Sequence, residues 1–229
     1  EDLDFSLIKK DEEFVFEKYF PSLRQHLLSF GFEMELSKKE KNISSQIQSA
    51  FLKGNTLKHL LQIFPGKNYT FKFSHNDSIK LKIEVDTNPP EGALLELKYL
   101  LNPLPVAIQI YDLPSLFSGK IHALLCRTWK KRVKGRDFFD FIWFLSKNIS
   151  VNLYHLEQRL RQNHFLTEEQ SLTKEVLIQL LVAKFAEVDY ELAKKDVEPY
   201  ISSNYDLSLW SSDFFRKITL DRLQVMVAE

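Results

Sequence analysis

Apolar and polar residues alternate along the first half of the chain, whereas apolar residues recur at helical spacing in the second half. Strict alternation is clearest in IKLKIEVD, residues 79–86, and predicts a strand with one apolar and one ionic face. Similar patterns predict strands at 3–7, 32–38, 46–52, 94–100 and 105–111. Helical spacing predicts helices at 11–30 (interrupted at Pro21), at 57–64, on both sides of a basic loop near 127–136, from 153 onward and at 211–227. The pattern predicts an α+β fold, with a mixed-sheet domain at 1–112 and a helical domain at 113–229.

Composition limits the classes of protein to which the chain can belong. Its 229 residues suffice for one large or two small domains, and 31 basic residues balance 31 acidic ones. The neutral total argues against a surface that binds polyanions all over, so any nucleic-acid contact must come from a local patch. A single cysteine excludes an intrachain disulfide framework and predicts, together with the lack of a membrane-length apolar run, a cytoplasmic protein.

Acidic residues at the start of the chain predict a metal site. Asp2 and Asp4 lie on the same face of the strand predicted at 3–7, and their carboxylate oxygens are ligands suited to Mg²⁺. Glu84, on the strand 79–86, supplies a third carboxylate if the two strands are neighbours. The alternative is that these acids are solvated residues of half-exposed strands.

Positive charge concentrates in the middle of the chain. Seven Lys or Arg and no carboxylate lie between Leu113 and Arg136. Lys120 and Arg127 are seven residues apart, so both are expected to project from one side of a helix. Asp137 and Asp140 share a face of the next helix. Asp137 can also have a purely structural role, because an acidic residue in the first turn of a helix interacts favourably with the free N–H groups and the helix dipole. The alternative to a functional site is a capped helix after a solvated basic loop.

These groups together predict transfer of a phosphate-containing group. Three carboxylates can hold two divalent ions against a triphosphate, and Lys120 and Arg127 can supply positive charge to it. Asp137 is expected to orient the lysine, bind metal or act as a base. No P-loop motif, Cys/His cluster or nucleophile elbow is present in the sequence. Among the histidines only His122 lies close to Lys120 in sequence, and a structural role is expected for it.

Three segments resemble the AbiEii/AbiGii-type nucleotidyltransferase toxin family. They are EDLDF at 1–5, KIEV at 82–85, and KIHAL…R at 120–127 followed by RDFFD at 136–140. The last pattern is the most specific of the three, and the resemblance covers nearly the whole chain. It implies a polymerase-β-like nucleotidyltransferase fold with a helical C-terminal domain.

The resemblance also implies roles for individual residues. Asp2, Asp4 and Glu84 would bind Mg²⁺ (or Mn²⁺), Lys120, Arg127 and Arg136 would contact an NTP, and Asp137 would be catalytic. The acceptor would be tRNA or another RNA, and a cognate antitoxin would be the protein partner.

Two alternatives to an active transferase stay open. The family's Gly-Ser turn precedes the acid pair and is not among the residues from Glu1 onward, so the chain could be a truncated or inactive relative that binds a nucleotide, an RNA or an antitoxin. A metal-dependent nuclease would use the same carboxylates but would not need Lys120 in this position.

Overall fold

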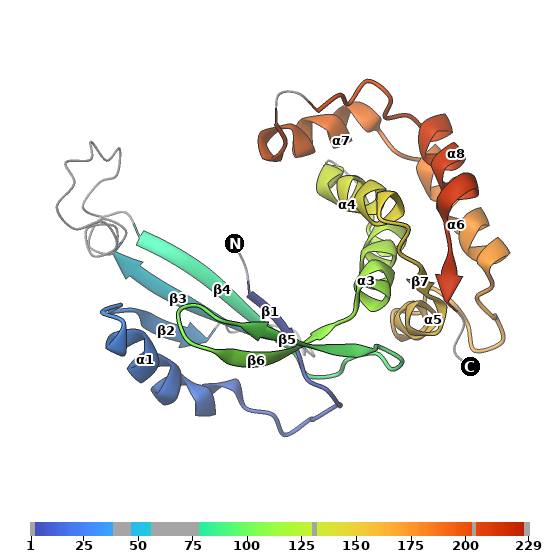
Figure 1. Ribbon diagram of the computed structural model, residues 1–229. Helices are drawn as coiled ribbons and strands as arrows, with labels where there is room; N and C mark the ends of the chain where they lie inside the picture. Colours follow the sequence, from blue (N-terminus) through green and yellow to red (C-terminus); the bar gives the residue numbers. More distant parts are fainter. Residues whose placement is uncertain (1–2, 39–46, 56–77, 130–131, 203–204, 227–229) are drawn as a thin grey trace. The chain divides into compact units, whose positions relative to one another are not determined.

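The structure is a computed structural model that describes residues 3–38, 47–55, 78–129, 132–202 and 205–226 (Figure 1). The chain forms two compact units, Glu1–Pro89 and Pro90–Glu229, and each is described by itself. The predicted helix at 57–64 and the predicted metal ligand Asp2 lie outside the described residues.

The first unit is built on a four-stranded mixed sheet with the order β1-β4-β3-β2. Its strands are β1 (Leu3–Ser6), β2 (Glu35–Lys38), β3 (Ile47–Asn55) and β4 (Ser78–Asp86). β1 runs parallel to β4, whereas β3 is antiparallel to both β2 and β4. Strands 1 and 4 are therefore neighbours although about eighty residues of sequence separate them.

One face of this sheet carries the small core of the first unit. Alternation along β4 buries Ile83 and Val85, which pack with three other buried side chains, Phe16, Met34 and Ala50. α1 (Phe20–Ser29) follows the 3₁₀ turn Phe16–Tyr19 and adds partly buried leucines to the same core. The helix predicted from residue 11 is wrong in its first part. Pro21 lies in the first turn of α1, where its missing N–H costs no hydrogen bond, so Pro21 marks a helix start rather than an interruption.

The second unit begins with a hairpin and continues as packed helices. The hairpin consists of β5 (Leu95–Leu100) and β6 (Val106–Tyr111), and the two-residue strands β7 (Val151–Asn152) and β8 (Val225–Met226) pair in parallel. The helices are α3 (Leu113–Cys126), α4 (Gly135–Ser146), α5 (Leu153–Gln162), α6 (Lys174–Ala186), α7 (Tyr190–Val197), the 3₁₀ turn η2 (Glu198–Tyr200) and α8 (Ser212–Arg222). No helix in the described part of the chain is both long enough and apolar enough to cross a membrane.

An aromatic cluster forms the centre of the helical unit. Phe138 of α4 is fully buried and its ring contacts Phe185, Phe215, Trp210 and Trp129 at centroid distances of 5.2 to 6.3 Å. Such contacts, drawn from three helices and two loops, bury large apolar rings and fix the position of α4. The N-terminal end of α4 is also held in place, because its backbone packs closely against α7.

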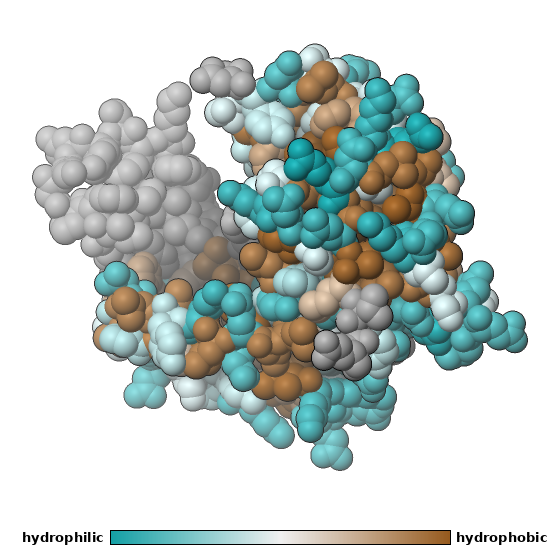
Figure 2. All heavy atoms as spheres, turned by 45° about the vertical axis from the view of Figure 1, so that its right-hand side comes forward, coloured by the Kyte–Doolittle hydropathy of each residue, from teal (hydrophilic) through white to brown (hydrophobic). Residues whose placement is uncertain are grey.

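The hairpin belongs to the helical unit, although the sequence placed the boundary at residue 112. The backbone N–H of Leu94 donates to Ser115 Oγ (2.9 Å), and Asn152 Nδ2 donates to the Gly92 carbonyl (2.8 Å). These hydrogen bonds join the segment that leads into the hairpin to α3 and β7. Leu97, Tyr99 and Leu101 of the hairpin are each more than half exposed. Figure 2 shows hydrophobic residues at the surface among hydrophilic ones on the face that it draws.

Candidate functional site

Two of the predicted acidic residues are brought together in the first unit. Asp4 on β1 pairs in parallel register with Glu84 on β4. Paired residues of adjacent strands lie about 4.8 Å apart and project to the same face of a sheet. This face is opposite to the one on which Ile83 and Val85 are buried, so the two carboxylates share one face of the sheet.

Glu84 has polar neighbours on both carboxylate oxygens. Ser49 of β3 is 2% exposed, and its hydroxyl donates to Glu84 Oε1 at 2.9 Å. Lys82 Nζ donates to Oε2 of the same carboxylate. Sequence reasoning missed Ser49, because its alignment with Glu84 depends on the register of β3 against β4. In the described part of the chain, no group of three His, Cys, Asp or Glu residues could hold a metal ion.

The oxygen donors that are described nevertheless fit a magnesium ion. Asp4 and Glu84 supply hard carboxylate oxygens from adjacent strands, and Mg²⁺ is typically bound by one or two carboxylates together with substrate phosphates. Lys82 competes for one oxygen of Glu84, so a cation that uses that oxygen must displace the ammonium group.

The predicted cations of the second unit are held by two carboxylates of α4. Lys120 Nζ lies 2.6 Å from Asp140 Oδ2, and Arg127 Nη1 lies 2.6 Å from Asp137 Oδ2. Asp140 rather than Asp137 therefore contacts the lysine. Arg127 is the C-cap of α3, with extended backbone angles, so the expected two-turn spacing from Lys120 does not describe its position.

The two ion pairs differ in burial. Asp137 is 2% exposed, and burial raises the pKa of its carboxyl above the ordinary value although the charges of Arg127, Lys134 and Lys120 oppose this shift. The side chains of Lys120 and Asp140 are 44% and 34% exposed. Burial of the charged Asp137 carboxylate therefore carries the larger desolvation penalty of the two pairs, and the ion pair with Arg127 offsets this penalty.

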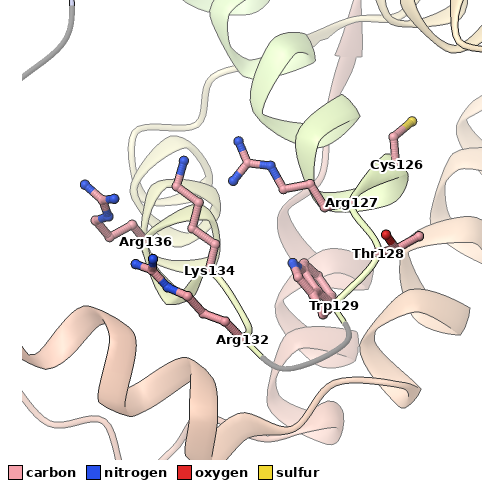
Figure 3. Close-up of a pocket in the computed structure, with 7 residues that line it drawn as sticks. All are labelled: Cys126, Arg127, Thr128, Trp129, Arg132, Lys134 and Arg136. Atoms are coloured by element: carbon pink, nitrogen blue, oxygen red, sulfur yellow. The ribbon is translucent and has the colours of Figure 1, made fainter. Parts of the chain in front are cut away.

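A pocket of about 660 Å³ lies beside this second pair (Figure 3). It is lined by Cys126, Arg127, Thr128, Trp129, Arg132, Lys134 and Arg136. The four cationic side chains extend to the same side of the segment that links α3 to α4 (Figure 3). Arg132 is paired with Asp196 at 2.6 Å, and the Arg136 guanidinium lies 4.5 Å from the centre of the Tyr200 ring. Burial raises the pKa of the Cys126 thiol, so this residue is no activated nucleophile.

The histidine that lies close to Lys120 in sequence has a structural environment. Asn163 Nδ2 lies 2.8 Å from His122 Nε2 and also donates to the Arg159 carbonyl at 3.2 Å. The amide nitrogen is therefore the donor, and His122 Nε2 accepts. Burial, with the nearby charges of Arg159, His155 and Arg127, lowers the pKa of His122 to about 4. His122 is thus neutral at pH 7, as expected for a packing residue.

A sheet with paired acids, followed by helices with a cationic site, defines an α+β protein of the nucleotidyltransferase class. The family model described as "Nucleotidyl transferase AbiEii toxin, Type IV TA system" matches residues 1–216. The chain belongs to this family of toxins from toxin–antitoxin systems, which confirms the resemblance found in the sequence. A comparison with curated proteins found no match.

Proposed function

We propose that the protein is a Mg²⁺-dependent nucleotidyltransferase that transfers a nucleotide from an NTP to an RNA acceptor, with tRNA as the candidate. The parallel register of Asp4 with Glu84 carries this proposal, because it puts two hard carboxylates side by side on one face of a sheet. Mn²⁺ is an alternative ion, and the reaction is expected in the cytoplasm. As a toxin of a toxin–antitoxin system, the protein has a cognate antitoxin.

In the first unit, Asp4 and Glu84 would hold the metal, and Asp2, which lies outside the described residues, is the third ligand expected from the sequence. Bound Mg²⁺ would neutralise triphosphate charge and make the attacking oxygen of the acceptor more nucleophilic. Ser49 keeps one oxygen of Glu84 in place, whereas Lys82 must leave the other oxygen when the ion uses it.

In the second unit, Lys120, Arg127 and Arg136 would contact the phosphates of the NTP. Their charge offsets the negative charge that develops on the leaving pyrophosphate. Asp140 positions Lys120 and Asp137 positions Arg127, each through a contact of 2.6 Å. We therefore assign Asp137 a positioning role, in place of the catalytic role expected from the sequence.

Transfer is tested directly with radiolabelled NTPs, total tRNA and Mg²⁺. The expected product is a labelled tRNA lengthened by one or more nucleotides, and Asp4→Asn and Lys120→Gln should each lower its formation at least 100-fold. Asp221→Asn, an exposed acid on α8, is the matched control and should leave transfer unchanged. Survival of transfer in either site variant would remove that residue from the proposed site, and shortened RNA would show a nuclease instead.

A second candidate is a catalytically inactive or truncated relative that binds a nucleotide, an RNA or the antitoxin. The cationic pocket beside α4 favours this candidate, since it could bind a polyanion without any chemistry. Calorimetric titration of each NTP with and without Mg²⁺ separates the two. Binding of NTP without transfer to any RNA would support the inactive relative.

A further inference from the structure

Two hydrogen-bond donors in the cationic pocket have no acceptor in the part of the chain that the structure describes. They are Trp129 Nε1 and Arg136 Nε, and both atoms are buried. A buried N–H group without a partner is uncommon in a folded protein and calls for a specific explanation, such as a ligand that supplies the acceptor. Both residues line the same pocket, which makes one shared ligand the simplest explanation.

The indole donor is held in a fixed position. Lys184 Nζ lies 4.5 Å from the centre of the Trp129 ring and donates to the Arg127 carbonyl at 2.8 Å. Phe138 contacts the indole at 5.3 Å. Because Lys184 and the aromatic cluster restrain the ring, its N–H is positioned before any ligand arrives.

The cationic side chains that line the pocket outnumber the carboxylates paired with them among the described residues. Arg127 and Arg132 each lie 2.6 Å from a carboxylate, Asp137 and Asp196 respectively. Among the carboxylates of the described residues, Lys134 approaches Asp137, at 3.8 Å, and it shares that carboxylate with Arg127. Burial, together with Arg127, Arg136 and Lys120, lowers the pKa of Lys134 although Asp137 opposes the shift. An anion in the pocket would relieve this crowding of positive charge.

We propose that Trp129 Nε1, Lys134 and Arg136 form a phosphate-binding subsite, an assignment that rests on the proposed function. Phosphate suits these groups because it carries up to two negative charges and several acceptor oxygens for an indole, an ammonium and a guanidinium donor. The volume of about 660 Å³ is far larger than one phosphate and suits a nucleotide-sized ligand. The phosphate can come from the triphosphate of the NTP or from the backbone of the acceptor RNA.

The first experiment observes the indole N–H itself. Inorganic pyrophosphate and a single-stranded RNA 12-mer are titrated separately into ¹⁵N-labelled full chain, and the Trp129 indole resonance is identified by its loss in Trp129→Phe. The chain has three tryptophans, so the other two serve as internal controls. The expected result is a downfield shift confined to Trp129 with at least one probe. No shift with either probe overturns the proposal.

The second experiment measures affinity for the same two probes. Trp129→Phe should weaken binding of the accepted probe about 5-fold, because it removes one hydrogen bond while the ring remains. Lys134→Gln with Arg136→Gln should weaken it about 30-fold and, for RNA, reduce the salt slope by about 1.4, since single strands contribute about 0.7 per phosphate contact. Arg216→Gln with Lys217→Gln, two exposed cations of α8, removes the same charge elsewhere and should change binding less than 2-fold.

The outcomes separate the two phosphate sources. If the pocket variants lose affinity for pyrophosphate alone, the subsite binds the NTP. If they lose affinity for RNA alone, it binds the acceptor. Equal effects of the pocket and control variants overturn the subsite. Failure of the proposed function has a different signature: wild-type protein would bind phosphate at Trp129 but transfer no nucleotide to any RNA.

Discussion

The two units of the molecule position their charged groups in different ways. In the first unit, backbone pairing between β1 and β4 sets Asp4 beside Glu84, and the exposed carboxylate of Asp4 needs no buried partner to lie there. In the second unit, Arg127 and Lys120 owe their positions to Asp137 and Asp140 on another helix. The acidic site is therefore fixed by the strands, whereas the basic site is fixed by side-chain pairs and close helix packing.

This contrast predicts where each site is sensitive to mutation. The acidic face should tolerate changes of single side chains with modest loss of stability, because sheet hydrogen bonds remain intact. The basic site should lose stability steeply when packing or a buried ion pair is disturbed, since a buried charge without its partner is costly.

Gly135→Ala should be the most damaging change, with a loss of roughly 3 kcal/mol or more. An added Cβ would lie 1.8 Å from the Ala193 carbonyl oxygen, a backbone atom of α7 that cannot move alone. Urea denaturation followed by circular dichroism measures the free energy of unfolding. Gly119→Ala is the matched control, because its Cβ would lie 3.8 Å from Arg159 Cζ, an ordinary contact, and should stabilise helix α3 by about 0.5–1 kcal/mol. Equal effects of the two substitutions would contradict close packing at the start of α4.

Arg127→Gln should cost roughly 2–3 kcal/mol at neutral pH, somewhat below the 3–5 kcal/mol typical of breaking a fully buried pair because the Arg127 side chain is 39% exposed. The variant leaves the Asp137 carboxylate buried, with Lys134 at 3.8 Å as its remaining ion-pair partner among the described residues. Lys98→Gln, which removes a cation from the exposed pair with Glu96, is the control and should change stability by less than 0.5 kcal/mol.

The loss in free energy of unfolding caused by Arg127→Gln should also depend on pH. A carboxyl with a raised pKa binds more protons in the folded than in the unfolded state, so its contribution to stability is present at low pH and is lost as pH rises through the folded pKa. Burial already raises the pKa of Asp137, and loss of Arg127 raises it further. The difference between variant and wild type should therefore shrink between pH 7 and pH 4. A constant difference would mean that Asp137 is not the buried charge.

His122 should make the protein less stable in acid by about 2 kcal/mol. Its pKa is lowered to about 4 from an ordinary value of 6.5, so the unfolded state binds more protons between these limits and stability falls as pH drops from 6.5 to 4. His122→Gln keeps an acceptor for Asn163 and should flatten this part of the curve. An acid limb that persists in His122→Gln would assign the titration to another group.

Ser49→Ala tests the first unit and should cost about 1–2 kcal/mol. The substitution removes the hydroxyl that donates to Glu84 Oε1, but Lys82 still contacts the other oxygen and the sheet register does not change. Ser29→Ala, at an exposed hydroxyl on α1, is the control and should be near neutral. A loss above about 3 kcal/mol would show that the acidic face depends on side-chain contacts as strongly as the basic one does.

The strands of both units could be predicted because alternation is a local signal. β4 (Ser78–Asp86) agrees with the pattern at 79–86, and the hairpin agrees with 94–100 and 105–111. Local sequence signals failed to predict where a helix begins when contacts with distant residues determine its start. The sequence TEEQ at 167–170 matches a capping box, a local signal for the start of a helix, and Gln170 Oε1 does accept from the Thr167 N–H at 3.0 Å. No helix begins there, however, because α6 begins at Lys174 with Thr173 as its cap.

The contacts within the site could be predicted only in part. Residue types and the two acidic strands were visible in the sequence, but the register of Asp4 with Glu84 depends on pairing across about eighty residues. Which aspartate faces Lys120 depends on how α3 and α4 cross, and no spacing rule encodes that crossing. The contact of Lys184 with Trp129 joins residues 55 positions apart and has no local signal.

Lys120→Gln should have the smallest effect on stability, below about 1 kcal/mol, because both partners of its ion pair are about a third or more exposed. A double-mutant cycle with Asp140→Asn measures the coupling free energy of the pair, which should also be below about 1 kcal/mol. The same lysine variant is expected to abolish nucleotide transfer. If the coupling instead reached the 2–3 kcal/mol expected for Arg127→Gln, Lys120 would be a structural cation like Arg127, and loss of transfer in its variant would no longer identify a phosphate contact. A small coupling free energy together with loss of transfer would show that the exposed pair Lys120–Asp140 serves the reaction, whereas the buried pair Arg127–Asp137 stabilises the fold and positions Arg127.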